Sequence, residues 1–306
     1  MADFKAVNRD RNPESTRTFP ATLVVQGPSG EQRLGVRIRT RGHARRNIAT
    51  CTFAPLRIEF PPGTAAGTVF DGHKTLKLGV HCRDVDLYEQ YVYREYLAYR
   101  IYNLISPRSL RARLATATYV DAESGKRLTS RAGLFLEDDD DVARRLDGEV
   151  TELRGMGFAH VDRETMTVVS LFEYMIGNTD VSLYALHNLV LVRAATSVVY
   201  PVPYDFDYSG LVNARYAIPS KEFGLSTVRE RLYRGPCRTP GELAPLLTRM
   251  GAAREAIMQL YDALPALDDG YRKDAKGYLA QFFRVIDRPD DVKRTFVDNC
   301  ANKSTM

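Results

Sequence analysis

Two acidic clusters that flank a pair of short apolar stretches constrain this chain more than any other feature of its sequence. The apolar stretches, residues 188–193 and 198–202, are close enough together to form the two strands of a hairpin. Asp180 precedes the first stretch, and Asp205 and Asp207 follow the second. A hairpin brings the start of its first strand beside the end of its second. We therefore expect the two clusters to meet.

Carboxylate and amide side chains gathered in this way suit a magnesium ion. Mg²⁺ prefers hard oxygen ligands and accompanies phosphates, and Mn²⁺ is the alternative metal. We expect Asn188, Asp205 and Asp207 to be the metal ligands. If the segment around Phe206 is extended, both aspartates lie on one side of it. A pair of surface acids is the alternative, and it fits the apolar neighbours poorly.

Asp180 follows Gly177-Asn178, a pattern typical of a helix that ends in a loop. We expect its carboxylate to act as a catalytic base or to orient an acceptor hydroxyl. The alternative is an ordinary helix-terminating turn, in which Asn and Asp are common. We expect His187 to form a local hydrogen bond, because no histidine in the chain has the spacing of a metal-ligand set.

Length and composition are those of an ordinary globular protein. The 306 residues, of which 44% are hydrophobic and 26% charged, can form one large domain or two lobes. The formal charge of +5 is mild, and basic residues gather within residues 37–46 and 229–234. No nucleic-acid-binding motif accompanies them, so we interpret both clusters as solvated or phosphate-facing surfaces and expect no nucleic-acid partner. We also expect no membrane span, because no apolar run approaches the roughly 20 residues that a spanning helix needs.

The four cysteines lack the paired spacing of a zinc site. Two alternatives stay open: two disulfides in an oxidising compartment, or four reduced and mostly buried thiols. If disulfides form, the pairing to test first joins Cys51 to Cys82 and Cys237 to Cys300.

Hydrophobic periodicity and turn residues predict an order of strands, one helix, more strands and then helices. Strands are expected at residues 19–26, 33–41, 55–60, 74–80, 111–121 and 129–136, and helices at residues 85–105, 165–176, 229–233, 240–264, 269–286 and 289–300. The acidic run at residues 137–141 is interpreted as a solvated loop between two parts of the chain. We thus predict an α+β, protein-kinase-like fold, with a small β-rich lobe at residues 1–141 and a larger helical lobe at residues 142–306.

Kinase chemistry also needs a lysine on the nucleotide phosphates and a glutamate that orients this lysine. Lys77 lies on the predicted strand before the long helix, and Glu95 lies on that helix. Lys74 and Glu89 are the alternatives. Gly42 ends an earlier strand, where a glycine allows backbone amides to approach a phosphate.

Together these residues resemble the CotH-like kinases, an atypical branch of the protein-kinase fold named for a spore-coat protein, spore coat protein H. The shared motifs are Arg41-Gly42, Arg94-Glu95-Tyr96-Leu97-Ala98-Tyr99, Ile176-Gly177-Asn178-Thr179-Asp180, His187-Asn188 and Pro203-Tyr204-Asp205-Phe206-Asp207. The resemblance covers residues 33–215. The family often has Trp before each of the two acids, where this chain has Thr179 and Tyr204.

The resemblance implies ATP-dependent phosphorylation of protein serines or threonines, with Asp180 as the catalytic acid/base and Asp205 as a metal ligand. Residues 228–234 look like a Gram-negative subgroup of the family, many of whose members look secreted. Membership of that subgroup would favour the disulfides and an extracytoplasmic location if a signal peptide has been removed. Without such a signal, the expected location is cytoplasmic.

Our leading hypothesis is an ATP- and Mg²⁺-dependent kinase that acts on a protein or small-molecule hydroxyl. Kinase-like folds also transfer AMP or glutamyl groups, and some are non-catalytic binding modules. A metal-dependent phosphatase or nuclease is a more distant alternative, because it would not need the pairing of Lys77 with Glu95.

Overall fold

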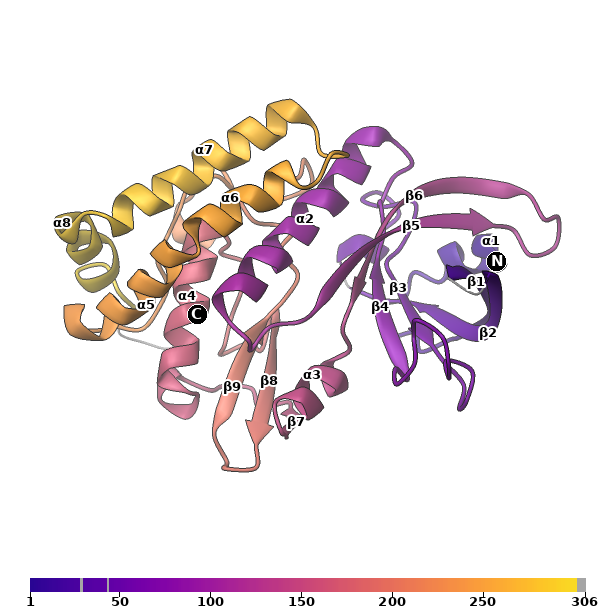
Figure 1. Ribbon diagram of the computed structural model, residues 1–306, viewed down its shortest axis with the longest axis horizontal. Helices are drawn as coiled ribbons and strands as arrows, with labels where there is room; N and C mark the ends of the chain where they lie inside the picture. The colour runs from indigo at the N-terminus through magenta and orange to yellow at the C-terminus, as the bar shows by residue number, and fades with distance from the viewer. Residues whose placement is uncertain (28–29, 43, 302–306) are drawn as a thin grey trace. The chain divides into compact units, whose positions relative to one another are not determined.

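Two antiparallel sheets and a set of helices make this a mixed α+β protein, as Figure 1 shows for the computed structural model. The structure describes residues 1–27, 30–42 and 44–301. The chain divides into two compact units, which we describe separately. Unit 1 comprises Met1–Tyr93 and Ala112–Asp138, and unit 2 comprises Arg94–Arg111 and the rest of the chain from Asp139.

Unit 1 is built on a curled, six-stranded antiparallel sheet with the order β1-β2-β3-β4-β6-β5. All six predicted strands are present. Their bounds are Phe19–Gly27 (β1), Gly30–Thr40 (β2), Leu56–Glu59 (β3), Thr75–Gly79 (β4), Ala112–Val120 (β5) and Arg127–Leu136 (β6). Residues 28 and 29 of the predicted β1–β2 turn lie outside the described residues, but Gly27 faces Gly30 across it.

The alternation predicted for β2 is present in its burial. Leu34, Val36 and Ile38 are buried, while Arg37 between them is exposed. A short helix that we did not predict, α1 (Phe4–Arg9), adds Phe4 and Val7 to the same core. The ring of Phe4 packs edge-on against that of Tyr119, 5.2 Å between centroids. Alternating apolar residues therefore place one face of the sheet against a continuous core.

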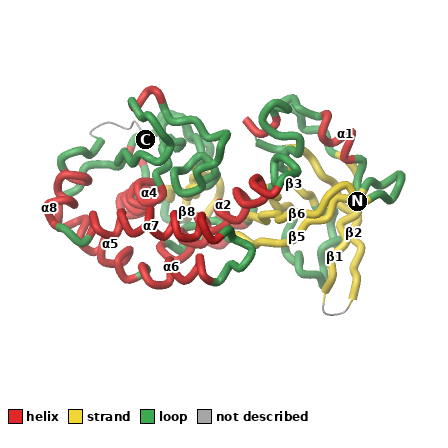
Figure 2. The backbone as a smooth tube through the Cα atoms, turned by 90° about the horizontal axis from the view of Figure 1, so that it is seen from above, coloured by secondary structure: helices red, strands yellow, loops and turns green. Residues whose placement is uncertain are grey.

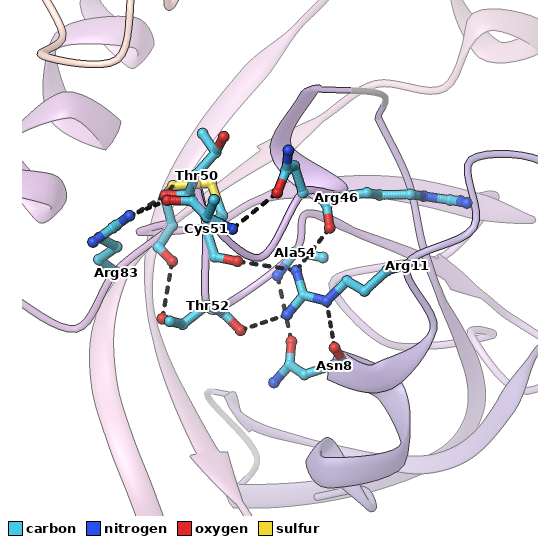
Figure 3. The surroundings of a disulfide bond; sticks show 11 residues. Asn8, Arg11, Arg46, Thr50, Cys51, Thr52, Ala54 and Arg83 are labelled. Atoms are coloured by element: carbon cyan, nitrogen blue, oxygen red, sulfur yellow. Dashed lines mark hydrogen bonds between the residues drawn. A yellow bond between two sulfur atoms is a disulfide. The ribbon is translucent and has the colours of Figure 1, made fainter.

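The pairing that we placed first is the one in the structure, with disulfides Cys51–Cys82 in unit 1 and Cys237–Cys300 in unit 2. Around the first disulfide, the loop that follows β2 has little regular structure (Figure 3). The backbone of this loop is bonded by a side chain rather than by a neighbouring strand. Arg11 donates hydrogen bonds to the carbonyl oxygens of Arg46, Cys51 and Thr52 at 3.2, 3.0 and 2.8 Å. The disulfide and the Arg11 guanidinium thus stabilise a loop that lacks regular secondary structure.

Two expectations about charged segments were wrong. Arg45 and Arg46 are buried rather than solvated, and the Arg46 guanidinium donates to the carbonyl oxygens of Asn12 and Thr40. The acidic run is not a solvated loop either. Its first two members are buried, with Asp138 paired to Arg57, and the remaining three form the first turn of α3 (Asp139–Arg145). Carboxylates at a helix N-terminus are stabilised by its dipole, which explains the helix here.

Helix α2 (Asp86–Ile105) lies where the sequence predicts it, with residues up to Tyr93 in unit 1 and the remainder in unit 2. Unit 2 adds the three-stranded sheet β7-β8-β9, of which β8 (Leu189–Ala194) and β9 (Val199–Pro203) form the predicted hairpin. Strand β7 (Gly148–Thr151), which we did not predict, pairs with β8. A buried helix, α4 (Arg163–Ile176), contacts β9 and α7 (Asp269–Ile286). Figure 2 shows the helices of this unit in red.

Three predicted helices differ from those of the structure. Residues 240–264 form two helices, α5 (Pro240–Ala252) and α6 (Arg254–Asp262), and residues 289–300 form only α8 (Pro289–Val292) followed by a wider turn at Lys293–Val297. Residues 229–233 are not helical. There the carboxylate of Glu230 accepts hydrogen bonds from the backbone N–H groups of Ser226 and Thr227, and side-chain bonds of this kind compete with a helix.

Candidate functional site

The two acidic clusters meet at the C-terminal end of α4. Gly177 ends this helix in the left-handed conformation, with φ of 66°. The backbone N–H of Gly210 donates to the carbonyl of Gly177, and that of Leu211 to the carbonyl of Ile176, both at 2.9 Å. A side chain at position 177 would clash, because a Cβ would lie 2.0 Å from the hydroxyl of Tyr278. Glycine here allows the segment after Asp207 to lie against the turn before Asp180.

Side chains on both flanks hold the carboxylate of Asp180. Its Oδ1 lies 3.2 Å from Nε2 of His187, and its Oδ2 accepts a hydrogen bond from Nδ2 of Asn188 at 3.1 Å. A backbone pair between Ser182 and His187 closes the intervening loop and returns the chain to Asp180. The Asp180 side chain stays 42% exposed, so a substrate hydroxyl can reach it.

The backbone around Asp180 is held from two further directions. Its N–H donates to Oδ1 of Asn178 at 3.0 Å. Arg234 donates from Nη1 to the carbonyl oxygens of Thr179 and Val181, at 2.9 and 2.8 Å. Burial lowers the pKa of Arg234 to about 10, so its guanidinium stays charged at neutral pH. The peptide groups on both sides of the candidate base are thus held by one charged donor.

The second acidic cluster, Asp205 and Asp207, follows the end of β9, with only Tyr204 between Asp205 and the last paired residue, Pro203. The N–H of Tyr204 donates to the carbonyl of Asn188 at 3.1 Å, so Asn188 and Asp205 belong to neighbouring positions of adjacent segments. Asp205 has a left-handed backbone with φ of 63°, and its N–H donates to the hydroxyl of Tyr99 at 2.9 Å. Aspartate tolerates the left-handed conformation better than most residues, and non-glycine residues in this conformation recur at functional sites.

Our expectation of an extended segment around Phe206 was wrong. The chain turns directly after this residue, because the N–H of Ser209 donates to the Phe206 carbonyl. The Phe206 ring is fully buried between those of Tyr99 and Phe172, with centroids 4.6 and 5.2 Å away. Asp207 is 3% exposed. Burial of the aromatic ring, rather than strand alternation, thus determines the path of the chain between the two aspartates.

A cavity of about 920 Å³ in unit 2 opens beside Asp180. Its lining includes Asp180, His187, Tyr208, Phe223 and Arg234. The Asp180 carboxylate accepts a hydrogen bond from His187 and so raises the pKa of this imidazole, and the charge of Asp205 raises it further. The cavity therefore presents a carboxylate, an imidazole and aromatic surface to whatever occupies it.

The predicted metal ligands fit a magnesium ion that shares its coordination with phosphates. In the described part of the chain, no group of three or more His, Cys, Asp or Glu side chains is arranged to hold a metal ion. The predicted set has only two carboxylates, and its third member is the amide of Asn188. Because Nδ2 of Asn188 donates to Asp180, Oδ1 is the atom of this amide that would ligate the metal. Mg²⁺ commonly takes one or two carboxylates and completes its shell with phosphate and water.

The remaining predicted residues lie in different parts of the chain. Lys77 on β4 is 5% exposed, whereas Lys74 before this strand is exposed. Glu95 on α2 is 4% exposed, but it belongs to unit 2 while Lys77 belongs to unit 1, and their pairing stays a prediction. Glu89 is used within unit 1, where its carboxylate accepts from the N–H of Ala132 at 2.6 Å and from Arg131.

Gly42, the predicted phosphate-loop residue, is exposed and has φ of 80°. His43 beside it lies outside the described residues. Gly42 thus has a positive-φ backbone that favours glycine, and its role in phosphate binding stays a prediction.

Sequence reasoning assigned no role to three residues that contact or lie behind this site. Tyr99 lies within a motif quoted for the family resemblance, and Arg234 lies within a basic cluster that we interpreted as a surface. Glu173 is a charged residue among the apolar residues of α4, and this interruption was the available signal.

The basic cluster at residues 229–234 is not a solvated surface. Arg229 and Arg231 both lie over the ring of Tyr278, at 4.3 and 3.6 Å from its centroid. Arg229 also pairs with Asp274 of α7. These arginines attach the irregular chain after β9 to a helix of the same unit.

Comparisons with known proteins add no assignment, since no family model matches the chain and no curated protein matches it. Within the described residues, no helix is both long enough and apolar enough to cross a membrane.

Proposed function

We propose that this protein is an ATP- and Mg²⁺-dependent phosphotransferase with a kinase-like fold, acting on a hydroxyl group of a protein or small molecule. The observation that carries the proposal is the setting of Asp180. Its carboxylate is held by His187 and Asn188 at the edge of a large cavity, and Asn188 adjoins the segment that carries Asp205. Kinase chemistry needs such a carboxylate at the acceptor hydroxyl, next to the ligands of the metal.

Each residue then has a defined task. Asp180 accepts the proton of the acceptor hydroxyl, which enters from the cavity. Asn188 and Asp205 hold the metal, and Asp207 is either a second ligand or an orienting neighbour. Bound Mg²⁺ supplies charge neutralisation on the nucleotide phosphates. The Tyr99 hydroxyl and the buried ring of Phe206 keep Asp205 in its left-handed conformation.

The sheet unit supports a nucleotide-binding role. Lys77 is buried on the strand that immediately precedes α2, and Glu95 is buried on this helix, which is the order of the lysine and glutamate of protein kinases. We propose that Lys77 binds the phosphates and that Glu95 orients it, with the two units as the lobes of the kinase-like fold.

The test combines labelled ATP with Mg²⁺ and follows both transfer of label and thermal stabilisation by nucleotide. We expect Asp180→Asn to lose about 10²–10⁴-fold in transfer while keeping stabilisation by Mg²⁺ and nucleotide. We expect Asp205→Ala to lose transfer and the Mg²⁺-dependent part of the stabilisation. Asp269→Asn, at a side chain that is 97% exposed, is the matched control and should behave as the unmodified protein.

Equal incorporation of label by the unmodified protein and Asp205→Ala would overturn the site assignment. The added mass on the acceptor separates phosphoryl transfer from AMP or glutamyl transfer, because each group leaves a different mass. Stabilisation by nucleotide without any transfer, across varied protein and small-molecule acceptors, would indicate a binding module.

A further inference from the structure

Glu173, in the last turn of α4, is a buried carboxyl group directly behind the candidate base. It is 2% exposed, and neither of its carboxylate oxygens makes a hydrogen bond with the described residues. A buried acid without partners is costly when charged, and such a group in a native structure needs an explanation. Burial raises the pKa of Glu173 to about 8, so the carboxyl is largely protonated at neutral pH.

Among the neighbouring groups, the side chain of Asn178 has the largest effect on the pKa of Glu173. The backbone N–H of Asn178 donates to the carbonyl oxygen of Glu173 at 2.8 Å, which joins the two residues, and the Asn178 amide lowers the pKa of Glu173. Asn178 is itself 3% exposed, and its Nδ2 makes no hydrogen bond with the described residues. Two adjacent buried polar groups therefore each lack a bond that the other can provide, directly or through one water.

Two further groups act on Glu173. The negative charge of Asp180 raises its pKa, and the positive charge of Arg234 lowers it. Glu173 thus lies in the last turn of α4, and the charges on the Asp180 loop and on Arg234 act on it in opposite directions.

The orientation of the Asn178 amide connects these observations to Asp180. Its Oδ1 accepts the hydrogen bond of the Asp180 N–H, so Nδ2 must point the other way. A flipped amide would set two donors against each other at the Asp180 N–H. A carboxyl oxygen beside Nδ2 favours the observed orientation, and a neutral carboxyl does so without adding a second negative charge behind Asp180.

We propose that Glu173 is a positioning residue that acts in its neutral form: its carboxyl oxygen receives the Nδ2–H of Asn178, keeps Oδ1 of Asn178 on the Asp180 N–H, and so holds the candidate base in place. The catalytic consequence rests on the proposed function, whereas the hold on the Asp180 backbone does not. Above the pH at which Glu173 ionises, its negative charge and that of Asp180 repel each other, and this repulsion displaces the candidate base.

Two variants of similar size separate this role from simple packing. Glu173→Gln keeps an acceptor oxygen and cannot ionise, so it reproduces the neutral carboxyl at every pH. Glu173→Leu keeps the volume and removes the acceptor. The first readout is hydrogen exchange of the Asp180 N–H, measured by NMR on the full chain without nucleotide. We expect exchange in Glu173→Gln within about twofold of the unmodified protein, and exchange at least about 10-fold faster in Glu173→Leu.

The second readout is the rate of phosphoryl transfer against pH. We expect kcat of Glu173→Leu to fall by about 10–100-fold with little change in KM, since a misplaced base affects the chemical step. Glu173→Gln should keep the neutral-pH rate and lose the decline that the unmodified protein shows as pH rises through about 8. If Glu173→Leu does not fold, Glu173→Met takes its place with the same expected exchange, and Asn178→Ala, which removes the acceptor Oδ1 itself, is the positive control.

Unchanged exchange in Glu173→Leu, or in the Glu173→Met variant that replaces it, would overturn the proposal. It would also fail if Glu173→Gln lost protection as Glu173→Leu does, because the neutral form would then be insufficient. Absence of transfer in the unmodified protein would contradict the proposed function alone, since the exchange readout needs no catalysis.

Discussion

The two sides of the candidate site are held by different kinds of interaction. Asp180 is partly exposed and is held by polar contacts with His187, Asn188 and Asn178. The segment that carries Asp205 is held by the buried ring of Phe206 and by backbone hydrogen bonds. A single polar contact contributes about 1 kcal/mol to stability, whereas a buried ring contributes several kcal/mol. The proposed metal side thus depends on a buried ring, whereas the proposed acceptor side depends on polar contacts that pH and neighbouring side chains affect.

The largest expected effect comes from removing the ring on the metal side. Phe206→Ala should lower the free energy of unfolding by about 3–5 kcal/mol, because the ring is fully buried between Tyr99 and Phe172. Denaturant unfolding measures this. The control is Tyr184→Ala, at a 61% exposed side chain, which should change stability by less than about 0.5 kcal/mol. Equal losses in the two variants would refute the dependence on a buried ring.

Gly177 forms the joint at which the two sides contact each other, and we expect its substitution to have the next largest effect on stability. Gly177→Ala should cost about 2–4 kcal/mol, since it combines a left-handed backbone with a methyl group 2.0 Å from the Tyr278 hydroxyl. Gly224→Ala is the matched control, with φ of 67° and nothing within 4 Å of the added Cβ, and should cost only about 1 kcal/mol. Thermal or denaturant unfolding of both variants isolates the steric part. A Gly177→Ala variant no less stable than its control would show that the joint can relax.

On the acceptor side, Arg234→Ala should cost about 1.5–3 kcal/mol, because it removes charged hydrogen bonds to the carbonyls of Thr179 and Val181. We also expect faster amide exchange in residues 179–182 and a lower transfer rate. Arg254→Ala, which removes a largely exposed pair with Asp287, is the control and should cost less than about 1 kcal/mol. If exchange in the Asp180 loop stayed at its original rate, the guanidinium would not be its support.

The smallest effect concerns pH. Asp180 raises the pKa of His187, so their pairing adds stability that is complete below the ordinary histidine pKa of about 6.5 and is lost as pH rises through the raised value. The His187 side chain is 56% exposed, which limits the contribution to less than about 1 kcal/mol. An NMR titration should show the pKa of His187 falling in Asp180→Asn and unchanged in Asp269→Asn. Identical titrations in all three proteins would exclude the pairing in solution.

Local patterns account for the parts of the fold that were predicted. The alternation in β2 and the apolar stripe of α4 are properties of neighbouring residues, so their periods identify these elements. The turn between β8 and β9 likewise predicted a hairpin that brings Asn188 beside the residues after β9. Helix α3 escaped prediction because its first turn is a run of acids, which composition alone assigns to a loop.

The sequence by itself determined the spacing of the strands, the hairpin and the two acidic clusters, because these depend on residues close together in the chain. Only the tertiary structure decided how each acid is held. The left-handed Asp205 depends on Tyr99, which is 106 residues away, and the Asp180 loop depends on Arg234, more than 50 residues away. The buried setting of Glu173 likewise arises from segments that meet only in the folded unit. Contacts of this kind have no period in the sequence, since packing and burial bring their partners together.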